Sequence, residues 1–302
     1  MKKLLVSTIL IFVGLISVDI IVGRIFITLS NRVLENSPAS LVADYAFKKL
    51  DSDIVIIGSS RGNHHYVSSL IEDSLNLSTY NVSRDGSFLF YQMCLIDKIL
   101  DNYSPRKILW NLEPTCFSDL SKKTSDLERL LPLYGQSQLL DSLLHSESAM
   151  ERVKLKSSMY RYNSLHFNYL YRSFIPISNK ANNGYRPIPN EGYNFPSMLM
   201  SDRMEGSLNE EIIDLFNKVV DKCGRTGVDL FFCLSPHYSN YEYKDFESYK
   251  LLSHIAIEKD IKLIDFYHNI SFMQDSTLFK DQDHMNDKGA RIFTNEIIKY
   301  LQ

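Results

Sequence analysis

The sequence predicts an α/β/α sandwich with a five-stranded parallel sheet, an N-terminal transmembrane helix and a mainly helical insertion. From residue 52 onward, short apolar runs alternate with segments of helical periodicity. The apolar runs are continuous, which is typical of strands that are buried on both faces. Because parallel strands need right-handed helical crossovers, we expect a flavodoxin-like sheet with helices on both sides.

The first half of this pattern contains three strands and two helices. "DIVIIG" at 53–58 predicts a buried strand, and "HYVSSLIEDSL" at 65–75 predicts a helix. "TYNVS" at 79–83 predicts the second strand, which a helix follows over "FLFYQMCLIDKILDNY" at 88–103. The third strand is "RKILWNLEP" at 106–114. These lengths are those of ordinary strands and helices.

The alternation stops between about residues 116 and 205, and we interpret this segment as an insertion. Helices are predicted at 123–131 and 136–146, followed by an aromatic stretch and a polar segment rich in Asn, Pro and Gly. Loops of that length without regular structure are usually functional or mobile. Two interpretations of the tyrosines in the aromatic stretch stay open, stacking on sugar rings or packing in a buried helix face. These tyrosines are Tyr160, Tyr162, Tyr169 and Tyr171.

Two more strands follow the insertion. The predicted order is a helix at 208–223, a strand at 228–236, a helix at 244–259, a strand at 262–267 and a last helix at 287–301. Ligands of open parallel sheets bind beyond the carboxyl ends of the strands. We therefore expect chemistry at five places, namely Gly58–Arg61, Ser83–Gly86, Asn111–Pro114, Ser235–His237 and the loop before the last helix.

Residues 1–30 predict a membrane anchor, and 31–51 a linker to a domain at 52–302. The apolar segment Leu4–Gly23 is just long enough to cross a hydrocarbon core of roughly 30 Å if Asp19 lies near the far interface. The two preceding lysines favour the cytoplasmic side, which places the following domain outside. A cleaved signal peptide is the rival interpretation, and it is disfavoured because apolar residues resume without a clean cleavage site.

Composition argues against some functions. The net charge is −3 and no broad basic field is present, so nucleic-acid binding has no electrostatic support. We expect no metal and no cofactor, since neither a metal-like cysteine spacing nor a CxxC pair occurs.

His64 and His65 are interpreted as solvated residues that open the first helix. Buried free thiols are expected for the four cysteines, Cys94, Cys116, Cys223 and Cys233.

Two serines follow the first predicted strand directly. Ser59 and Ser60 lie between Gly58 and Gly62, which permit a tight turn. A serine at this edge, with helix N-terminal amides nearby, suits a nucleophile whose intermediate needs oxyanion donors. Taken alone, the pattern fits an N-capping serine better.

An Asp-x-x-His sequence precedes the last helix and favours the nucleophile over the N-capping serine. Asp281 and His284 lie in "LFKDQDHMNDKGARIF" at 278–293. At this spacing the carboxylate can orient the imidazole while the other ring nitrogen faces a serine. Asp283 adjoins His284, but neighbouring residues rarely point the same way, so Asp281 is the predicted carboxylate. The serine and this pair are expected to meet at one edge of the sheet.

Three blocks together resemble the SGNH (GDSL-like) hydrolase superfamily. The closest likeness is to its membrane-anchored, exported branch, which includes polysaccharide O-acetyltransferase domains and the D-alanyl-lipoteichoic acid biosynthesis protein. "IIGSS" with "RG" matches the first block, and the family register makes Ser60 the nucleophile. "YNVSRDGSF" matches the second, whose glycine, Gly86, supplies an oxyanion amide. "DQDHMNDKGA" matches the last, with Asp281 and His284 completing the triad.

One family block is missing. The Gly-x-Asn-Asp sequence is absent and "WNLEP" stands in its place, which leaves Asn111 as the side-chain oxyanion donor, or pointing away from the site. Arg61 either binds an anionic group or pairs with a carboxylate. His237 at the fourth strand end either touches substrate or is an ordinary loop residue.

The resemblance implies acyl transfer or ester hydrolysis on an acylated cell-surface carbohydrate, with a membrane protein as acyl donor. The alternative is a non-catalytic, membrane-anchored carbohydrate-binding or assembly factor on the same scaffold. The missing block and the aromatic insertion favour that alternative. A nucleotide-binding function is disfavoured because the loop after the first strand lacks a phosphate-binding glycine pattern.

Overall fold

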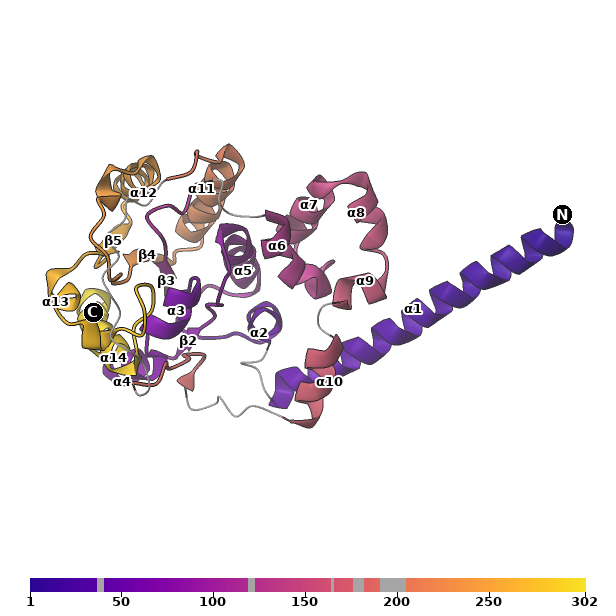
Figure 1. Cartoon of the computed structure of the whole chain (residues 1–302), viewed down its shortest axis with the longest axis horizontal. Helices are drawn as coiled ribbons and strands as arrows, with labels where there is room; N and C mark the ends of the chain where they lie inside the picture. The colour runs from indigo at the N-terminus through magenta and orange to yellow at the C-terminus, as the bar shows by residue number, and fades with distance from the viewer. Residues whose placement is uncertain (37–40, 119–122, 164–165, 176–181, 191–204) are drawn as a thin grey trace. The chain divides into compact units, whose positions relative to one another are not determined.

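A computed structural model describes residues 1–36, 41–118, 123–163, 166–175, 182–190 and 205–302 (Figure 1). The chain forms two compact units. The helical unit comprises Met1–Tyr45 and Leu127–Ser178, and the sheet unit comprises Ala46–Asp126 and Asn179–Gln302. The predicted insertion is therefore divided, because its central part belongs with the N-terminal helix.

The sheet unit has the predicted architecture of five parallel strands with helices on both sides. The strand order is β2-β1-β3-β4-β5, and every neighbouring pair is parallel. The chain leaves β1 in one direction to form β2 and then crosses back to form β3, so the strand order reverses at β1 and β3. The strands are β1 (Ile54–Ile57), β2 (Thr79–Asn81), β3 (Lys107–Asn111), β4 (Asp229–Leu234) and β5 (Lys262–Asp265).

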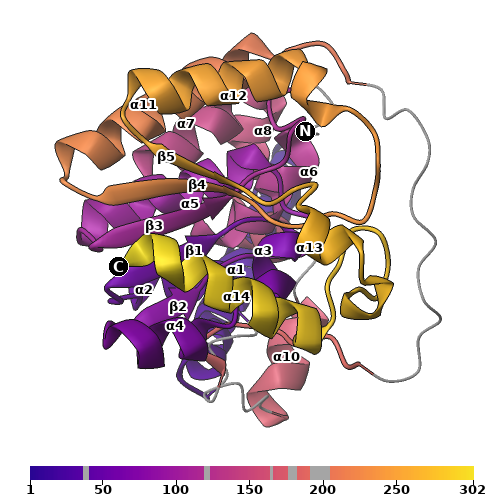
Figure 2. The same cartoon turned by 90° about the vertical axis from the view of Figure 1, so that its left-hand side faces the viewer.

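The helices of the sheet unit cover both faces of the sheet (Figure 2). Side chains of α4 and α14 pack with β1 in one buried cluster that contains Ile56, Ile71 and Phe293. On the other face, Trp110 of β3 packs on Phe216 of α11. The helices are α3 (Ser60–His65), α4 (Ser68–Leu75), α5 (Leu89–Asn102), α11 (Glu210–Arg225), α12 (Glu247–Glu258), α13 (Ile270–Met273) and α14 (Asp287–Leu301), with 3-10 turns at Tyr243–Asp245 and Ser276–Leu278.

The predicted helix at 65–75 needs a correction. Helix already begins at Ser60, and the chain breaks at Tyr66 and Val67, both in extended conformation, before α4 starts. The break buries the Tyr66 ring, and the Val67 N–H remains satisfied because it donates to Thr294 Oγ1 at 2.9 Å. His65 is also buried rather than solvated, and its Nε2 accepts the Met285 N–H at 2.9 Å.

The helical unit is built on α1 (Lys2–Asn36), which is long and apolar enough to cross a membrane. The predicted linker at 31–51 contains the end of α1 and α2 (Val42–Lys48). The helix predicted at 123–131 is α6 (Lys123–Leu127) continued by a 3-10 helix at Glu128–Leu133, and the helix predicted at 136–146 is α7 (Gln138–Glu147). Three short helices were not predicted, α8 (Ala149–Lys154), α9 (Ser158–Tyr162) and α10 (His166–Phe174).

The tyrosines of the aromatic stretch have different environments. Tyr162 and Tyr169 pack in a buried cluster with Val33 and Leu41, which confirms the buried-face interpretation for these two. Tyr171 is exposed. All four cysteines are free, and three of them are fully buried.

Candidate active site

The first candidate element is the turn between β1 and α3. Ser60 is the first residue of α3, while Ser59 is the N-cap residue and its side chain makes no capping hydrogen bond. Gly58 lets β1 and β3 approach, because a Cβ there would lie 2.9 Å from the Asn111 Cβ. Gly62, one turn later, lets α3 approach the segment after β2, since a Cβ there would meet Ser83 Oγ at 2.5 Å. Larger residues at either glycine would displace the backbone that carries Ser60.

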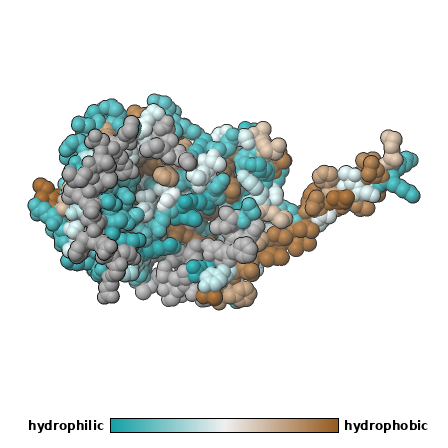
Figure 3. All heavy atoms as spheres, in the orientation of Figure 1, coloured by the Kyte–Doolittle hydropathy of each residue, from teal (hydrophilic) through white to brown (hydrophobic). Residues whose placement is uncertain are grey.

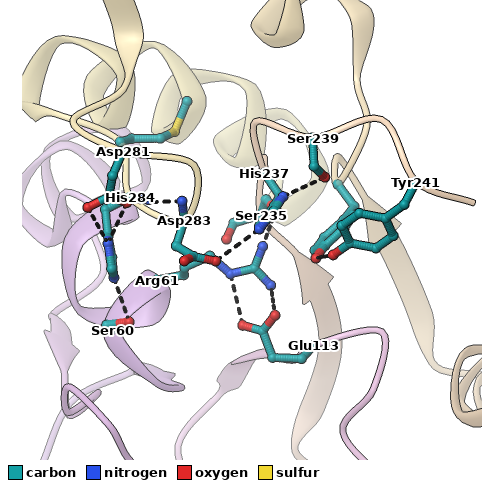
Figure 4. Close-up of polar contacts among 12 residues, drawn as sticks. Ser60, Arg61, Glu113, Ser235, His237, Ser239, Tyr241, Asp281, Asp283 and His284 are labelled. Carbon is teal, nitrogen blue, oxygen red and sulfur yellow. Dashed lines mark hydrogen bonds and ion pairs between the residues drawn. The ribbon is translucent and has the colours of Figure 1, made fainter. Parts of the chain in front are cut away.

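Ser60, His284 and Asp281 form a continuous hydrogen-bonded chain (Figure 4). Ser60 Oγ lies 2.8 Å from His284 Nε2, and His284 Nδ1 lies 2.8 Å from Asp281 Oδ1. With the proton on Nδ1, His284 donates to the carboxylate and its Nε2 accepts the Ser60 hydroxyl. The three residues predicted from the motifs are therefore brought together, within the distances expected of a nucleophile, a base and its orienting acid.

The loop before α14 holds the Asp281 carboxylate in place. Asp281 Oδ1 accepts the backbone N–H groups of Asp283 at 3.0 Å and of His284 at 2.9 Å. Burial alone would raise the pKa of Asp281, but its hydrogen bond with His284 and these backbone donors bring that pKa below its usual value. The carboxylate is therefore ionised at neutral pH. Asn286 then caps α14 by accepting the Gly289 N–H at 3.1 Å, which fixes where the loop ends.

Three hydrogen-bond donors near Ser60 lack an acceptor among the described residues. They are the backbone N–H groups of Ser60 and Gly86 and the side-chain amide Nδ2 of Asn111. Gly86 has a φ of 65°, a left-handed conformation that glycine adopts without strain. The Tyr66 hydroxyl donates to Asn111 Oδ1 at 2.7 Å, so the amide group is held with Nδ2 as the free donor. Asn111, whose orientation the sequence left open, lines the same cavity as Ser60.

These groups line a cavity of about 280 Å³ in the sheet unit. Ser60, Gly86, Asn111 and His284 are on its wall. Phe88, Leu89 and Leu112 make part of the wall apolar. The cavity is thus large enough for a small ligand, and its polar groups gather at Ser60.

Arg61 pairs with a carboxylate, the second of the two interpretations offered by the sequence. Its guanidinium makes two hydrogen bonds to Glu113, of which the Nε to Oε1 bond is 2.8 Å, and it lies 4.8 Å from the centre of the Tyr267 ring. Burial alone would lower the pKa of Arg61, but Glu113 raises it above its usual value. Glu113 belongs to the "WNLEP" sequence, so the segment that stands in place of the family block holds Arg61, the residue after Ser60.

His237 does not line the cavity and is only 1% exposed. Its Nε2 donates to Asp283 at 2.9 Å, and its Nδ1 accepts the Ser239 hydroxyl at 2.6 Å (Figure 4). The Ser239 oxygen in turn lies 2.9 Å from His268 Nε2. Burial lowers the pKa of His237 and brings that of His268 to about 4, so both rings are neutral at pH 7.

This network supports the loop that carries His284. Asp283 is on the cavity wall, and its hydrogen bond from His237 holds the pKa of its carboxyl well below the usual range. Asp281 and Asp283 therefore have separate partners, His284 and His237 respectively. The sequence drew attention to Asp283 only as a rival for Asp281. It gave no signal for Glu113 or Tyr66, whose importance depends on contacts between distant segments.

Comparison with protein-family models and with curated proteins finds no match to this chain. The likeness to SGNH hydrolases therefore depends on the motif residues themselves.

Proposed function

We propose that this chain is a membrane-anchored serine acyl-esterase or O-acyltransferase. The observation that carries the proposal is the hydrogen-bonded chain from Ser60 through His284 to Asp281, which ends at a cavity with three unused donors. A nucleophile, a base, an orienting carboxylate and oxyanion donors are the parts that acyl transfer requires. The proposed substrate class is an acylated cell-surface carbohydrate, which follows from the SGNH resemblance and from the apolar N-terminal helix.

The first half-reaction forms the acyl-enzyme. Ser60 Oγ attacks the ester carbonyl while its proton passes to His284 Nε2, and Asp281 stabilises the resulting imidazolium. The carbonyl oxygen becomes an oxyanion, which accepts hydrogen bonds from the Ser60 and Gly86 N–H groups and from Asn111 Nδ2. The carbon–oxygen bond of the ester then breaks, and the departing alcohol takes the proton from His284.

The second half-reaction releases Ser60. Water or a sugar hydroxyl attacks the acyl-enzyme, gives its proton to His284, and Ser60 leaves with that proton restored. An esterase and a transferase share these steps and differ in which nucleophile reaches the acyl group. A membrane protein that delivers acyl groups is part of the transferase version of the proposal. In both versions the two lysines at the start of α1 lie in the cytoplasm and the sheet unit lies outside.

A fluorophosphonate probe tests the proposal because it reacts with activated serines. We expect labelling of the wild-type protein and no labelling of Ser60→Ala. Ser59→Ala is the matched control, since this neighbouring serine is outside the hydrogen-bonded chain, and it should label like the wild type. Labelling that persists in folded Ser60→Ala contradicts Ser60 as the nucleophile.

A non-catalytic carbohydrate-binding or assembly factor is the second candidate, favoured by one observation. The Gly-x-Asn-Asp block is absent, and Glu113 in its place forms an ion pair with Arg61. For this function we expect a glycan to bind Ser60→Ala and His284→Ala as well as wild type, with no probe labelling of any of the three proteins and no release of acyl groups. The labelling assay and a glycan-binding assay together separate the two functions.

A further inference from the structure

One side of α1 is covered by α9, beginning at Asp19. The Asp19 carboxylate accepts the Ser157 hydroxyl at 2.6 Å and the N–H groups of Ser158 and Met159 at 2.9 Å each. Gly23, one turn later, allows a close approach, because a Cβ there would lie 2.4 Å from Ser158 Oγ. The carboxylate that interrupts the apolar helix thus fastens α9 to α1.

Aromatic packing continues this contact toward the end of α1. Phe26 stacks on Tyr162 of α9 with ring centres 5.7 Å apart, and Tyr162 contacts Tyr169 of α10 at 5.8 Å. Both tyrosines are buried in the cluster that includes Val33 of α1. The helices α9 and α10 are therefore bound to one side of α1 from Asp19 to Val33.

The length of the apolar segment places α9 close to the membrane surface. Residues 4–18 lie before the covered part of α1 and extend about 22 Å at 1.5 Å per residue. A hydrocarbon core is about 30 Å thick, so about five more residues, up to Gly23, are needed to cross it. The first and last of those five residues, Asp19 and Gly23, are the ones that meet α9. Other side chains of α1 stay apolar and exposed at this level, namely Ile20, Ile21 and Ile25. Figure 3 shows the hydrophobic colouring along much of α1.

The helices beside this level expose apolar side chains of their own. On α10, Leu170 and Phe174 are 49% and 70% exposed, and Tyr171 and Ile175 are also exposed. Their spacing of i, i+1, i+4 and i+5 puts them on one stripe, away from Tyr169, which packs toward α1. On α8, Met150 and Val153 form a similar exposed pair, three residues apart.

The charges of the same segment suit an anionic surface. Between residues 149 and 175, the sequence has one acidic side chain, Glu151, and five basic ones, Arg152, Lys154, Lys156, Arg161 and Arg172. Apolar and aromatic side chains combined with basic residues are typical of helices that lie in the headgroup region. Each basic residue near an anionic leaflet adds an attraction that salt weakens.

We propose that α8–α10 form a second membrane contact, in which the exposed apolar stripe of α10 inserts at the headgroup boundary of the bilayer that α1 crosses. The contact continues the apolar surface of α1, and its partner is an anionic lipid surface. This interaction does not depend on the proposed catalysis. It gives the central part of the insertion a function, which is to hold the helical unit against the bilayer.

Tryptophan quenching by brominated lipids tests the proposal on the full-length protein in nanodiscs that contain phosphatidylglycerol. Phe174→Trp places a reporter on the stripe, and Ile257→Trp places one on α12 of the sheet unit, where the Ile257 side chain is exposed to solvent. Wild-type emission comes from the buried Trp110 and is subtracted. We expect lipids brominated near the headgroup to quench the emission of the Phe174→Trp variant and to shift it to shorter wavelength relative to that of the Ile257→Trp variant.

Equal quenching at positions 174 and 257, or none at 174, overturns the proposal. An apolar stripe meant for a protein partner gives that second result, because these nanodiscs contain only lipid, this chain and the scaffold protein at the rim of the disc. Tyr171→Trp is a second reporter on the same stripe in case Phe174→Trp does not fold, and circular dichroism checks each variant. Quenching at 171 or 174 that decreases when phosphatidylglycerol is replaced by phosphatidylcholine supports the role of the basic residues.

Discussion

Asn111→Ala removes a buried side-chain donor from the cavity wall and addresses the residue about which the sequence was least informative. The Asn111 amide nitrogen has no acceptor among the described residues, and the Tyr66 hydroxyl holds the amide oxygen at 2.7 Å. An oxyanion that forms on substrate would therefore gain a donor whose orientation is already fixed. Removing such a donor weakens the transition state more than substrate binding.

Asn111→Ala is expected to affect both catalysis and folding stability. Loss of one oxyanion donor typically lowers kcat by about 10²–10³-fold, or roughly 3–4 kcal/mol, and we expect that loss for Asn111→Ala with little change in KM. The same change leaves the buried Tyr66 hydroxyl without its acceptor, which costs roughly 1–3 kcal/mol of folding free energy. Tyr66→Phe is the matched control, because it keeps Nδ2 and removes only the group that orients it.

The assay is hydrolysis of p-nitrophenyl acetate, with urea unfolding to separate the two effects. We expect Tyr66→Phe to lose less activity than Asn111→Ala. The reasoning fails if folded Asn111→Ala keeps kcat within about twofold of wild type, since that is less than about 0.5 kcal/mol of transition-state free energy. In that case the backbone N–H groups of Ser60 and Gly86 alone would stabilise the oxyanion.

Three further predictions concern the surrounding charges. Asp281→Asn should lower kcat by about 10³–10⁴-fold in the same hydrolysis assay, because the amide favours the wrong His284 tautomer; a loss below tenfold would exclude this role. Glu113→Gln should reduce the free energy of unfolding by about 2–4 kcal/mol, because it leaves the Arg61 guanidinium buried without its counter-charge. In urea titrations, Arg61→Met combined with Glu113→Met should cost less than the sum of the single changes, and additivity would contradict the coupling. Burial lowers the pKa of His65 well below 6.5, so the unfolded chain binds a proton that the fold excludes, and stability should decrease as pH falls below about 6.5. His65→Gln should flatten that slope, and an unchanged slope would assign it to other groups.

The parallel strands, the sheet edge that carries Ser60 and the long apolar N-terminal helix could be predicted because each depends on local sequence. Continuous apolar runs such as 54–57 identify buried strands, and parallel topology then brings their carboxyl ends to one edge. The Asp281 to His284 spacing is likewise a local property. The hydrogen bond between Ser60 and His284 links residues 224 positions apart, but two local motifs at one sheet edge were sufficient to suggest it.

Other features depend on packing that local sequence does not encode. The ion pair of Arg61 with Glu113 requires the end of β3 to lie beside α3, and the solvated interpretation of His65 was wrong because α14 covers that residue. The helical unit was not predicted as a unit, since its two segments are separated by more than 80 residues. From the sequence, Asp19 was expected near a membrane interface. Its hydrogen bond with the distant Ser157 became evident only from the structure.

Direct detection of the acyl-enzyme tests the central claim most sharply. The protein is mixed with p-nitrophenyl acetate, quenched in acid within the first turnovers, digested and analysed by mass spectrometry. The account predicts one acetyl group on Ser60, with accumulation when the second half-reaction is the slower step, and no adduct in His284→Ala. An adduct on Ser59, or hydrolysis that depends on Ser60 and proceeds without any acetyl group on Ser60 under rapid quenching, would contradict it.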